Sequence, residues 1–368
     1  MKVVIIGAGQ TGRGFVAPIF YKNDFEITFL DKNCDLIQML NKKSKYTVSY
    51  FGKKNNYDVV IDRYLAFSVQ DPKAVTAIAE ADIVTTSVFV QNLPELGPLL
   101  VKAIAQRNAC RNKLLVITVE NSINAPDMLK EYNIDADISA GVIFCTSVNK
   151  EALDITSEHG LMLPVDGEKI SHKFVIDGMP LIENFDTLIK RKIYTYNFMS
   201  AVISYLGSYK KYQFLDEASL DEEIINFLKE LEKPHNLVMS KYFQVSFENQ
   251  IDFWNSAYRK FSNPEIKDPI ARNAQQALRK LGQNERLLFP MKIVDQMGGE
   301  VWPYVVLIAS ALYYALDKEE ATWAEIKKFI AEMEVSNTQR EGITSVLSKL
   351  RKQYQLHDLC TQEALYSM

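Results

Sequence analysis

The chain has 368 residues, of which 47% are hydrophobic and 24% are charged, and its formal net charge is −4. A chain of this length exceeds the usual size of a single hydrophobic core, so we expect two domains. The acidic balance argues against a nucleic-acid surface, because such a surface needs many Lys and Arg side chains to displace the counterions of phosphates. A small molecule or another protein is the expected partner.

No apolar run approaches the roughly 18 residues that a membrane-spanning helix needs. The N-terminal Met-Lys leads directly into a predicted strand, which is not the pattern of a signal peptide. We therefore expect a cytoplasmic protein without a membrane partner.

The cysteines and histidines show no spacing typical of a metal or redox site, so we expect free thiols and no bound metal. They are Cys34, Cys110, Cys145 and Cys360, and His159, His172, His235 and His357.

The first thirty-one residues have the pattern of a dinucleotide-binding βαβ unit. An apolar strand over residues 3–6 precedes a G-x-G-x-x-G turn and a helix, and the next strand ends in Asp31, about 20 positions after the turn. In such a unit the first glycine allows the tight turn, the second admits a pyrophosphate to backbone N–H groups, and the third lets the helix pack closely on the sheet. The predicted cofactor-binding residues are Gly7, Ala8, Gly9, Gln10, Thr11, Gly12 and Asp31.

Asp31 favours NAD over NADP, because a carboxylate accepts hydrogen bonds from the ribose hydroxyls and repels a 2′-phosphate. Lys32 beside it is a cation that could tolerate such a phosphate.

The following segments alternate between predicted helices and strands, as in a doubly wound sheet. Helices are predicted over 35–42, 74–81 and 93–106, and strands over 83–88, 114–119 and 136–147. A hairpin with strands 46–51 and 57–62 and a polar turn at 52–56 interrupts the alternation. Two short strands within 160–176 are expected to complete a small mixed sheet that bridges the domains.

The strand 114–119 ends in Glu120 and Asn121, at the edge where open α/β sheets bind their ligands. Asn121 is either a turn residue or an amide directed at substrate or nicotinamide, and its position leaves both alternatives open.

From about residue 188 the pattern becomes helical to the end, which predicts a Rossmann-type domain over 1–187 and an all-helical domain over 188–368. Later helices are predicted over 220–231, 265–281, 285–296, 304–315 and 323–332. Prolines are expected near the helix starts, where a missing N–H costs little. They are Pro234, Pro264, Pro269, Pro290 and Pro303.

Lys192 lies early in an otherwise apolar helix. Burial there would lower its pKa toward the range useful to a general base, whereas a snorkelling side chain would carry the ammonium to water. At about 100° per residue, Asn197 and Ser200 lie about 60° apart and Lys192 about 80° from Ser200, so all three can border one pocket.

Several ordered motifs resemble the polyol-specific long-chain dehydrogenases, in particular the mannitol-1-phosphate 5-dehydrogenase branch. The motifs are Gly7-Ala8-Gly9-x-x-Gly12-Arg13-Gly14-Phe15, Glu120-Asn121, Arg191-Lys192-x-Tyr194-Thr195-x-Asn197, Tyr205-Leu206-Gly207, and Arg259-Lys260-Phe261-Ser262-Asn263-Pro264 leading to Asp268, Arg272 and Leu278-Arg279-Lys280-Leu281. They span nearly the whole chain.

The resemblance implies metal-free hydride transfer between NAD and a polyol or its phosphate, with Glu120 and Asn121 beside the cofactor. In the motif K-x-x-x-x-N-x-x-H, Lys192 would be the general base, and Asn197 and Asn121 would hold the oxygen that becomes the carbonyl. Ser200 stands where the motif has histidine, and a hydroxyl cannot carry a proton near neutral pH as imidazole does.

The basic residues that could grip a substrate phosphate are Arg259, Lys260, Arg272, Arg279 and Lys280, and we favour Arg272 and Arg279. Gln275 stands where the resemblance implies an arginine.

The leading hypothesis is an NAD-dependent oxidoreductase with its active site between the domains, which interconverts mannitol 1-phosphate and fructose 6-phosphate. The alternatives are a dehydrogenase of another sugar alcohol or sugar acid, and a catalytically silent NAD(H)-binding sensor. A monomer or small homo-oligomer is expected.

Overall fold

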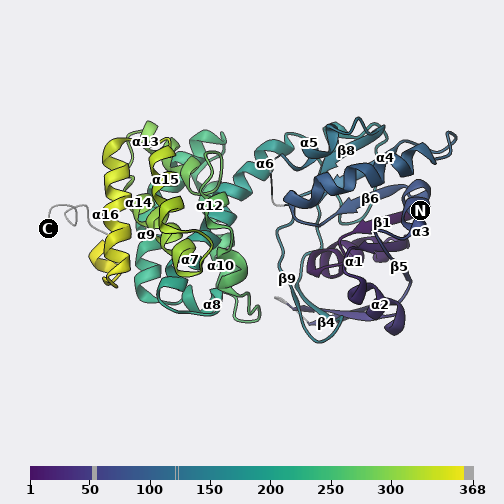
Figure 1. Ribbon diagram of the computed structural model, residues 1–368, viewed down its shortest axis with the longest axis horizontal. Coiled ribbons are helices and arrows are strands. Elements are labelled where there is room, and N and C mark those ends of the chain that lie inside the picture. The colour runs from purple at the N-terminus through teal and green to yellow at the C-terminus, as the bar shows by residue number, and fades with distance from the viewer. Residues whose placement is uncertain (52–55, 121, 123, 360–368) are drawn as a thin grey trace. The chain divides into compact units, whose positions relative to one another are not determined.

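The computed structural model describes residues 1–51, 56–120, 122 and 124–359. Their contacts divide the chain into unit 1, Met1–Ile189, and unit 2, Lys190–Met368, and helix α6 (Phe185–Lys192) crosses the division. Figure 1 labels the elements of both units.

Unit 1 is built on a six-stranded sheet in the order β5-β2-β1-β6-β7-β8, and every neighbouring pair is parallel. Its strands are β1 (Lys2–Ile6), β2 (Glu26–Asp31), β5 (Tyr64–Ser68), β6 (Ile83–Thr86), β7 (Leu114–Thr118) and β8 (Ala136–Ala140). The order reverses between β1 and β6, which makes this the switch point where such sheets bind ligands. The predicted Rossmann-type sheet is confirmed.

Both faces of this sheet are covered, because its central strands are apolar at successive positions. Val4 and Ile6 pack against α3 (Pro72–Glu80), α4 (Gly97–Ala105) and α5 (Ala125–Lys130), while Val3 and Ile5 belong to the core on the opposite face. That second core also contains residues of α1 (Ala17–Lys22) and α2 (Cys34–Lys43).

A four-stranded mixed sheet contributes to the second core, in the order β4-β3-β10-β9. Its strands are β3 (Tyr46–Phe51), β4 (Tyr57–Ile61), β9 (Ser147–Asn149) and β10 (Ile155–Glu158). The predicted hairpin is confirmed by the antiparallel pairing of β3 with β4, although most of its turn, 52–55, lies outside the described residues.

Two strand predictions for this region are wrong. The strand expected over 136–147 ends at Ala140, and the segment 160–176 contains only β11 (Val165–Asp166), which pairs with β12 (Leu181–Ile182). After β11 the chain enters the 3₁₀ turn η3 (Gly167–Lys169), because the Asp166 carboxylate accepts the N–H of Glu168 and caps it. All four strands of the mixed sheet belong to unit 1.

The helix predicted over 93–106 is also divided. A 3₁₀ segment, η2 (Val90–Leu96), precedes α4, and each contains a proline near the junction. Pro94 and Pro98 supply no N–H to a continuous α-helical ladder.

The secondary-structure elements of unit 2 among the described residues are all helices, as predicted for this part of the chain. Its elements are η4 (Ile193–Asn197), α7 (Phe198–Tyr209), α8 (Leu215–Ala218), α9 (Glu222–Tyr242), α10 (Phe247–Phe261), α11 (Ile270–Ala274), α12 (Ala277–Lys280), α13 (Leu288–Gln296), α14 (Trp302–Asp317), α15 (Trp323–Glu332), α16 (Asn337–Arg351) and η5 (His357–Leu359). Helices α7 and α14 are buried on nearly all sides and form the centre of the unit.

Two predictions about these helices are wrong. The segment 265–281 forms two short helices, because Gln276 between them adopts a left-handed φ of +61° that ends α-helical geometry. Pro234 lies inside α9 and not near a start, since that helix continues to Tyr242 and buries apolar residues on both sides of the proline. Helices α10 and α16 were not predicted.

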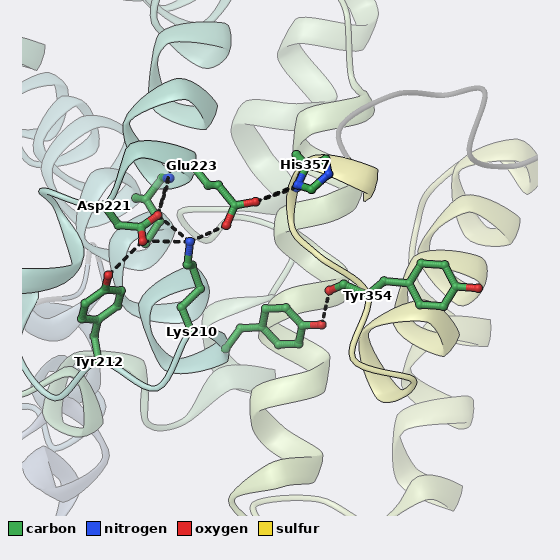
Figure 2. Close-up of polar contacts among 8 residues, drawn as sticks. Lys210, Tyr212, Asp221, Glu223, Tyr354 and His357 are labelled. Carbon is green, nitrogen blue, oxygen red and sulfur yellow. Dashed lines mark hydrogen bonds and ion pairs between the residues drawn. The ribbon is translucent and has the colours of Figure 1, made fainter.

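A polar cluster fastens the segment after α16 to the rest of unit 2 (Figure 2). The Glu223 carboxylate accepts hydrogen bonds from the backbone N–H of His357 and from the Lys210 ammonium. The hydroxyl of Tyr209 donates to the carbonyl of Tyr354 over 2.5 Å.

No helix among the described residues is both long and apolar enough to cross a bilayer.

Candidate active site

The glycine turn between β1 and the first helix has the conformation that a dinucleotide site requires. Gly7 has a φ of +99°, and a Cβ on Gly12 would lie 2.0 Å from the Gly7 carbonyl oxygen, so neither position tolerates a side chain without movement. A Cβ on Gly9 would meet no atom within 4 Å. The space in front of Gly9 is therefore open for a pyrophosphate.

Other predicted cofactor residues surround this turn. Ala8 is buried, whereas Gln10 and Thr11 are partly exposed at the beginning of the helical segment. The Asp31 carboxylate, at the end of β2, accepts the N–H of Ala8 at 2.7 Å and the N–H of Asn33 at 2.8 Å. Asp31 thereby connects two adjacent strand ends, and its carboxylate has further lone pairs for ribose hydroxyls.

Arg13 is a structural residue of the turn that sequence analysis quoted only as part of the family motif. Its side chain is 3% exposed and donates from Nε to the Ala8 carbonyl at 2.7 Å, and the guanidinium also donates to the Leu153 carbonyl. Because Leu153 connects β9 to β10, Arg13 joins the glycine turn to the mixed sheet. Burial lowers the pKa of Arg13 from its ordinary value.

Glu120 is a mostly buried carboxyl at the carboxyl end of β7. It accepts the backbone N–H of Val88 at 2.8 Å and the hydroxyl of Thr86 at 3.4 Å, so it ties β7 to the turn that follows β6. Burial raises its pKa to about 7, against the opposing effect of these hydrogen bonds. Asn121, the next residue, lies outside the described residues.

In unit 2, Lys192 and Asn197 flank a π-turn. The segment Ile193–Asn197 forms η4, in which the N–H of Phe198 binds the carbonyl of Ile193, five residues earlier. In an α-helix, residues five apart point about 140° away from each other. A π-turn adds one residue to the turn, so Lys192 and Asn197 lie one turn apart on the same side of the helix. The rotation of about 100° per residue from which their arrangement was predicted therefore does not apply here.

Burial distinguishes these two side chains from surface residues. Lys192 is 6% exposed, which does not fit a snorkelling lysine. The Nδ2 of Asn197 is buried and has no hydrogen-bond partner among the residues that the structure describes. A buried donor without a hydrogen-bond partner destabilises a protein by about 1–3 kcal/mol. A ligand that accepts a hydrogen bond from the Asn197 amide would account for its presence here.

A side chain from α9 forms a hydrogen bond with the Tyr194 carbonyl of the π-turn. His235 is fully buried, and its Nε2 lies 2.9 Å from the Tyr194 carbonyl while Nδ1 lies 2.9 Å from the Tyr304 hydroxyl. Desolvation lowers the pKa of His235 to about 3, so the imidazole is neutral. A neutral ring that donates from Nε2 accepts at Nδ1, which fits the tyrosine hydroxyl as donor.

Ser200, at the position of the motif histidine, donates its hydroxyl to the Oδ1 of Asn273 at 3.2 Å. Lys280 donates its ammonium to the backbone carbonyl of the same Asn273 at 2.5 Å. Burial, followed by repulsion from Arg286 and Arg279, lowers the pKa of Lys280 to about 6. The structure thus places a buried, easily deprotonated lysine on the residue that Ser200 contacts.

The two arginines favoured for a phosphate are paired with carboxylates. Arg272 forms a bidentate pair with Asp268, with distances of 2.8 and 2.7 Å, and Arg279 contacts Glu285 at 3.0 Å. Their side chains remain 39% and 38% exposed. Among the described residues, no group of three His, Cys, Asp or Glu side chains could hold a metal ion.

Over residues 1–150 the sequence matches the mannitol dehydrogenase Rossmann domain, and over residues 184–366 it matches the mannitol dehydrogenase C-terminal domain. The chain belongs to the mannitol dehydrogenase family. The resemblance inferred from the motifs is therefore confirmed.

Curated relatives in the mannitol dehydrogenase family extend over most of the chain. Mannitol-1-phosphate 5-dehydrogenase of Caldanaerobacter subterraneus subsp. tengcongensis is 25% identical, with coverage of 96% of this chain and 98% of the relative. The enzyme of the same name from Lactococcus lactis subsp. lactis is 30% identical, with coverage of 79% and 81%.

Solved structures share the fold. The ternary complex of Pseudomonas fluorescens mannitol 2-dehydrogenase with NAD and D-mannitol superposes with a TM-score of 0.73 at 13% identity, covering 100% of this chain and 94% of that chain. A D-sorbitol dehydrogenase in substrate-free form gives a TM-score of 0.69 at 14% identity, covering 99% and 91%. At these identities the likeness concerns the fold alone.

Two contacts at the candidate residues could not be predicted from the sequence. The His235 contact with Tyr194 and the Glu120 contact with Val88 join residues far apart in the chain, and no local pattern encodes them. Lys280 was expected only as a candidate for the substrate phosphate, and its burial against Asn273 was not predicted.

Proposed function

We propose that this chain is an NAD-dependent oxidoreductase that transfers a hydride between nicotinamide and a polyol phosphate, interconverting mannitol 1-phosphate and fructose 6-phosphate. The observation that carries the proposal is the pairing, across one π-turn, of a buried lysine with a buried amide donor that lacks a partner among the described residues. The curated relatives named mannitol-1-phosphate 5-dehydrogenase support the substrate.

NAD would be held by the glycine turn and Asp31. The open space at Gly9 suits the pyrophosphate, and the Asp31 carboxylate suits the adenosine ribose. Glu120 lies at the same edge of the sheet, and Asn121 is a further proposed contact of the cofactor. When bound, NAD supplies a hydride acceptor or donor for the carbinol carbon.

The protein side chains would move the proton and bind the substrate oxygen. Lys192, which is buried, takes the hydroxyl proton during oxidation and returns it during reduction. Asn197 donates its free N–H to the oxygen that becomes the carbonyl, and Asn121 shares this role. The Ser200 hydroxyl donates to Asn273, so its oxygen can accept a hydrogen bond from a substrate hydroxyl but does not transfer a proton.

Arg272 and Arg279 are the proposed contacts of the substrate phosphate. Each guanidinium retains exposed surface and would exchange part of its carboxylate pairing for the phosphate. Alanine at either position is expected to raise KM for fructose 6-phosphate and to leave NADH affinity unchanged.

Turnover assays separate the candidate functions. The absorbance of NADH is followed with fructose 6-phosphate, with fructose, and with sugar acids, for the wild type and for Lys192→Ala. We expect activity with fructose 6-phosphate that Lys192→Ala abolishes, while the variant keeps its NADH affinity. Activity only with unphosphorylated compounds would support the alternative dehydrogenase, and NADH binding without turnover would support the sensor suggested by Ser200.

We also propose that the chain acts in the cytoplasm as a monomer or small homo-oligomer and has no nucleic-acid partner. The net charge of −4 supports the last point. Cell fractionation and size-exclusion chromatography with light scattering test the location and the oligomeric state.

A further inference from the structure

The turn after β6 lies directly against the glycine turn. Ser87 donates its hydroxyl to the Gly7 carbonyl at 3.0 Å, and its N–H binds the Ile6 carbonyl at 2.8 Å. Because the strand order reverses between β1 and β6, this turn lies at the switch point, where sheets of this kind bind their ligands.

Phe89 occupies this turn in an unfavourable backbone conformation. Its φ is +67° and its ψ is 136°, a backbone conformation that residues with a side chain rarely adopt, so the backbone is strained at this position. Its side chain contributes nothing to the core, since the residue is 67% exposed. A strained residue that exposes an apolar ring at the ligand-binding edge of the sheet is expected to have a functional role.

Glu120 holds the turn in this conformation. Its carboxyl accepts the N–H of Val88 at 2.8 Å and also interacts with the N–H of Phe89. These two amides have no place in the β6 ladder, which ends at Thr86. Glu120 therefore compensates the backbone groups that the strained turn exposes.

We infer that the ring of Phe89 stacks on one of the two planar rings of the bound dinucleotide, and that Glu120 is the positioning residue that holds it there. The inference rests on the proposed function, because it requires NAD in the glycine turn. Adenine and nicotinamide both present a flat face on which an aromatic side chain can stack. The binding experiment below distinguishes which of the two rings contacts Phe89.

The test titrates NADH and ADP-ribose, which lacks nicotinamide, into the wild type, Phe89→Ala, Phe89→Tyr and Leu65→Ala. Leu65 is 59% exposed on β5 and serves as the matched control. Phe89→Ala is expected to weaken NADH binding about tenfold, as for one lost stacking contact, while Phe89→Tyr and Leu65→Ala bind normally. A parallel loss for ADP-ribose assigns the contact to adenine, and a loss for NADH alone assigns it to nicotinamide.

A double-mutant cycle tests the role of Glu120. If Glu120 acts through Phe89, Glu120→Ala weakens NADH binding, and adding it to Phe89→Ala causes no further loss. Fully additive losses would overturn the positioning role, and unchanged NADH affinity of folded Phe89→Ala would overturn the inference while leaving NAD binding intact. A wild type that does not bind NADH would refute the proposed function and this inference with it.

Discussion

Replacing Glu120 with glutamine tests the electrostatics of the candidate site through protein stability. The folded-state pKa of Glu120 is about 7, against an ordinary value of 4.5. Because folding favours the protonated form, the stability that this group contributes is complete below the ordinary pKa and is lost as pH rises through the folded pKa. Glutamine stays neutral at every pH and accepts the Val88 N–H through its amide oxygen.

The full shift corresponds to about 3 kcal/mol at about 1.4 kcal/mol per pKa unit. The carboxyl retains some exposure and several hydrogen bonds, so we expect Glu120→Gln to stabilise the protein by about 1–2 kcal/mol at a pH of about 8.5 and to have little effect near pH 4.5.

The assay is thermal or urea unfolding of both proteins at the two pH values, followed by far-UV circular dichroism. Tryptophan fluorescence is unsuitable because Trp254, Trp302 and Trp323 all belong to unit 2. Glu80→Gln is the control, since Lys2 lowers the pKa of Glu80 and its loss should slightly destabilise the protein above pH 4.5. A Glu120→Gln effect independent of pH would refute the buried-carboxyl reasoning.

Four further substitutions test the proposed site. Gly9→Ala should weaken NADH binding and leave the unfolding temperature unchanged, because its Cβ meets no protein atom. Gly12→Ala should lower both the unfolding temperature and the NADH affinity, because its Cβ would collide with the Gly7 carbonyl oxygen. Calorimetry with NADH titration measures both quantities, and equal unfolding temperatures of the two variants would contradict this reasoning. Asp31→Ala should reduce the preference for NADH over NADPH, and an unaltered ratio of dissociation constants would show that Asp31 does not contact the ribose. Ser200→His should raise kcat by about 10²-fold if a missing imidazole limits turnover, and an unchanged kcat would show that proton transfer does not depend on this position.

The amino-acid sequence was sufficient to predict the elements whose signals are local. The spacing of Gly7, Gly9, Gly12 and Asp31 predicts a βαβ unit, because the turn needs the positive φ of Gly7 and leaves no room for a Cβ on Gly12 beside the Gly7 carbonyl. The change from alternating elements to helical periodicity likewise separates an α/β part from a helical part. Both features depend on neighbours a few residues away.

The geometry of the candidate catalytic residues depends instead on contacts between distant parts of the chain. The π-turn that aligns Lys192 with Asn197 is stabilised by His235, 41 residues from the carbonyl it contacts, and the turn bearing Phe89 is held by Glu120, 32 residues beyond Val88. A departure from α-helical or extended geometry needs partners for the backbone groups that it displaces. Those partners come from other elements of the fold, so they cannot be predicted from the periodicity of the segment itself.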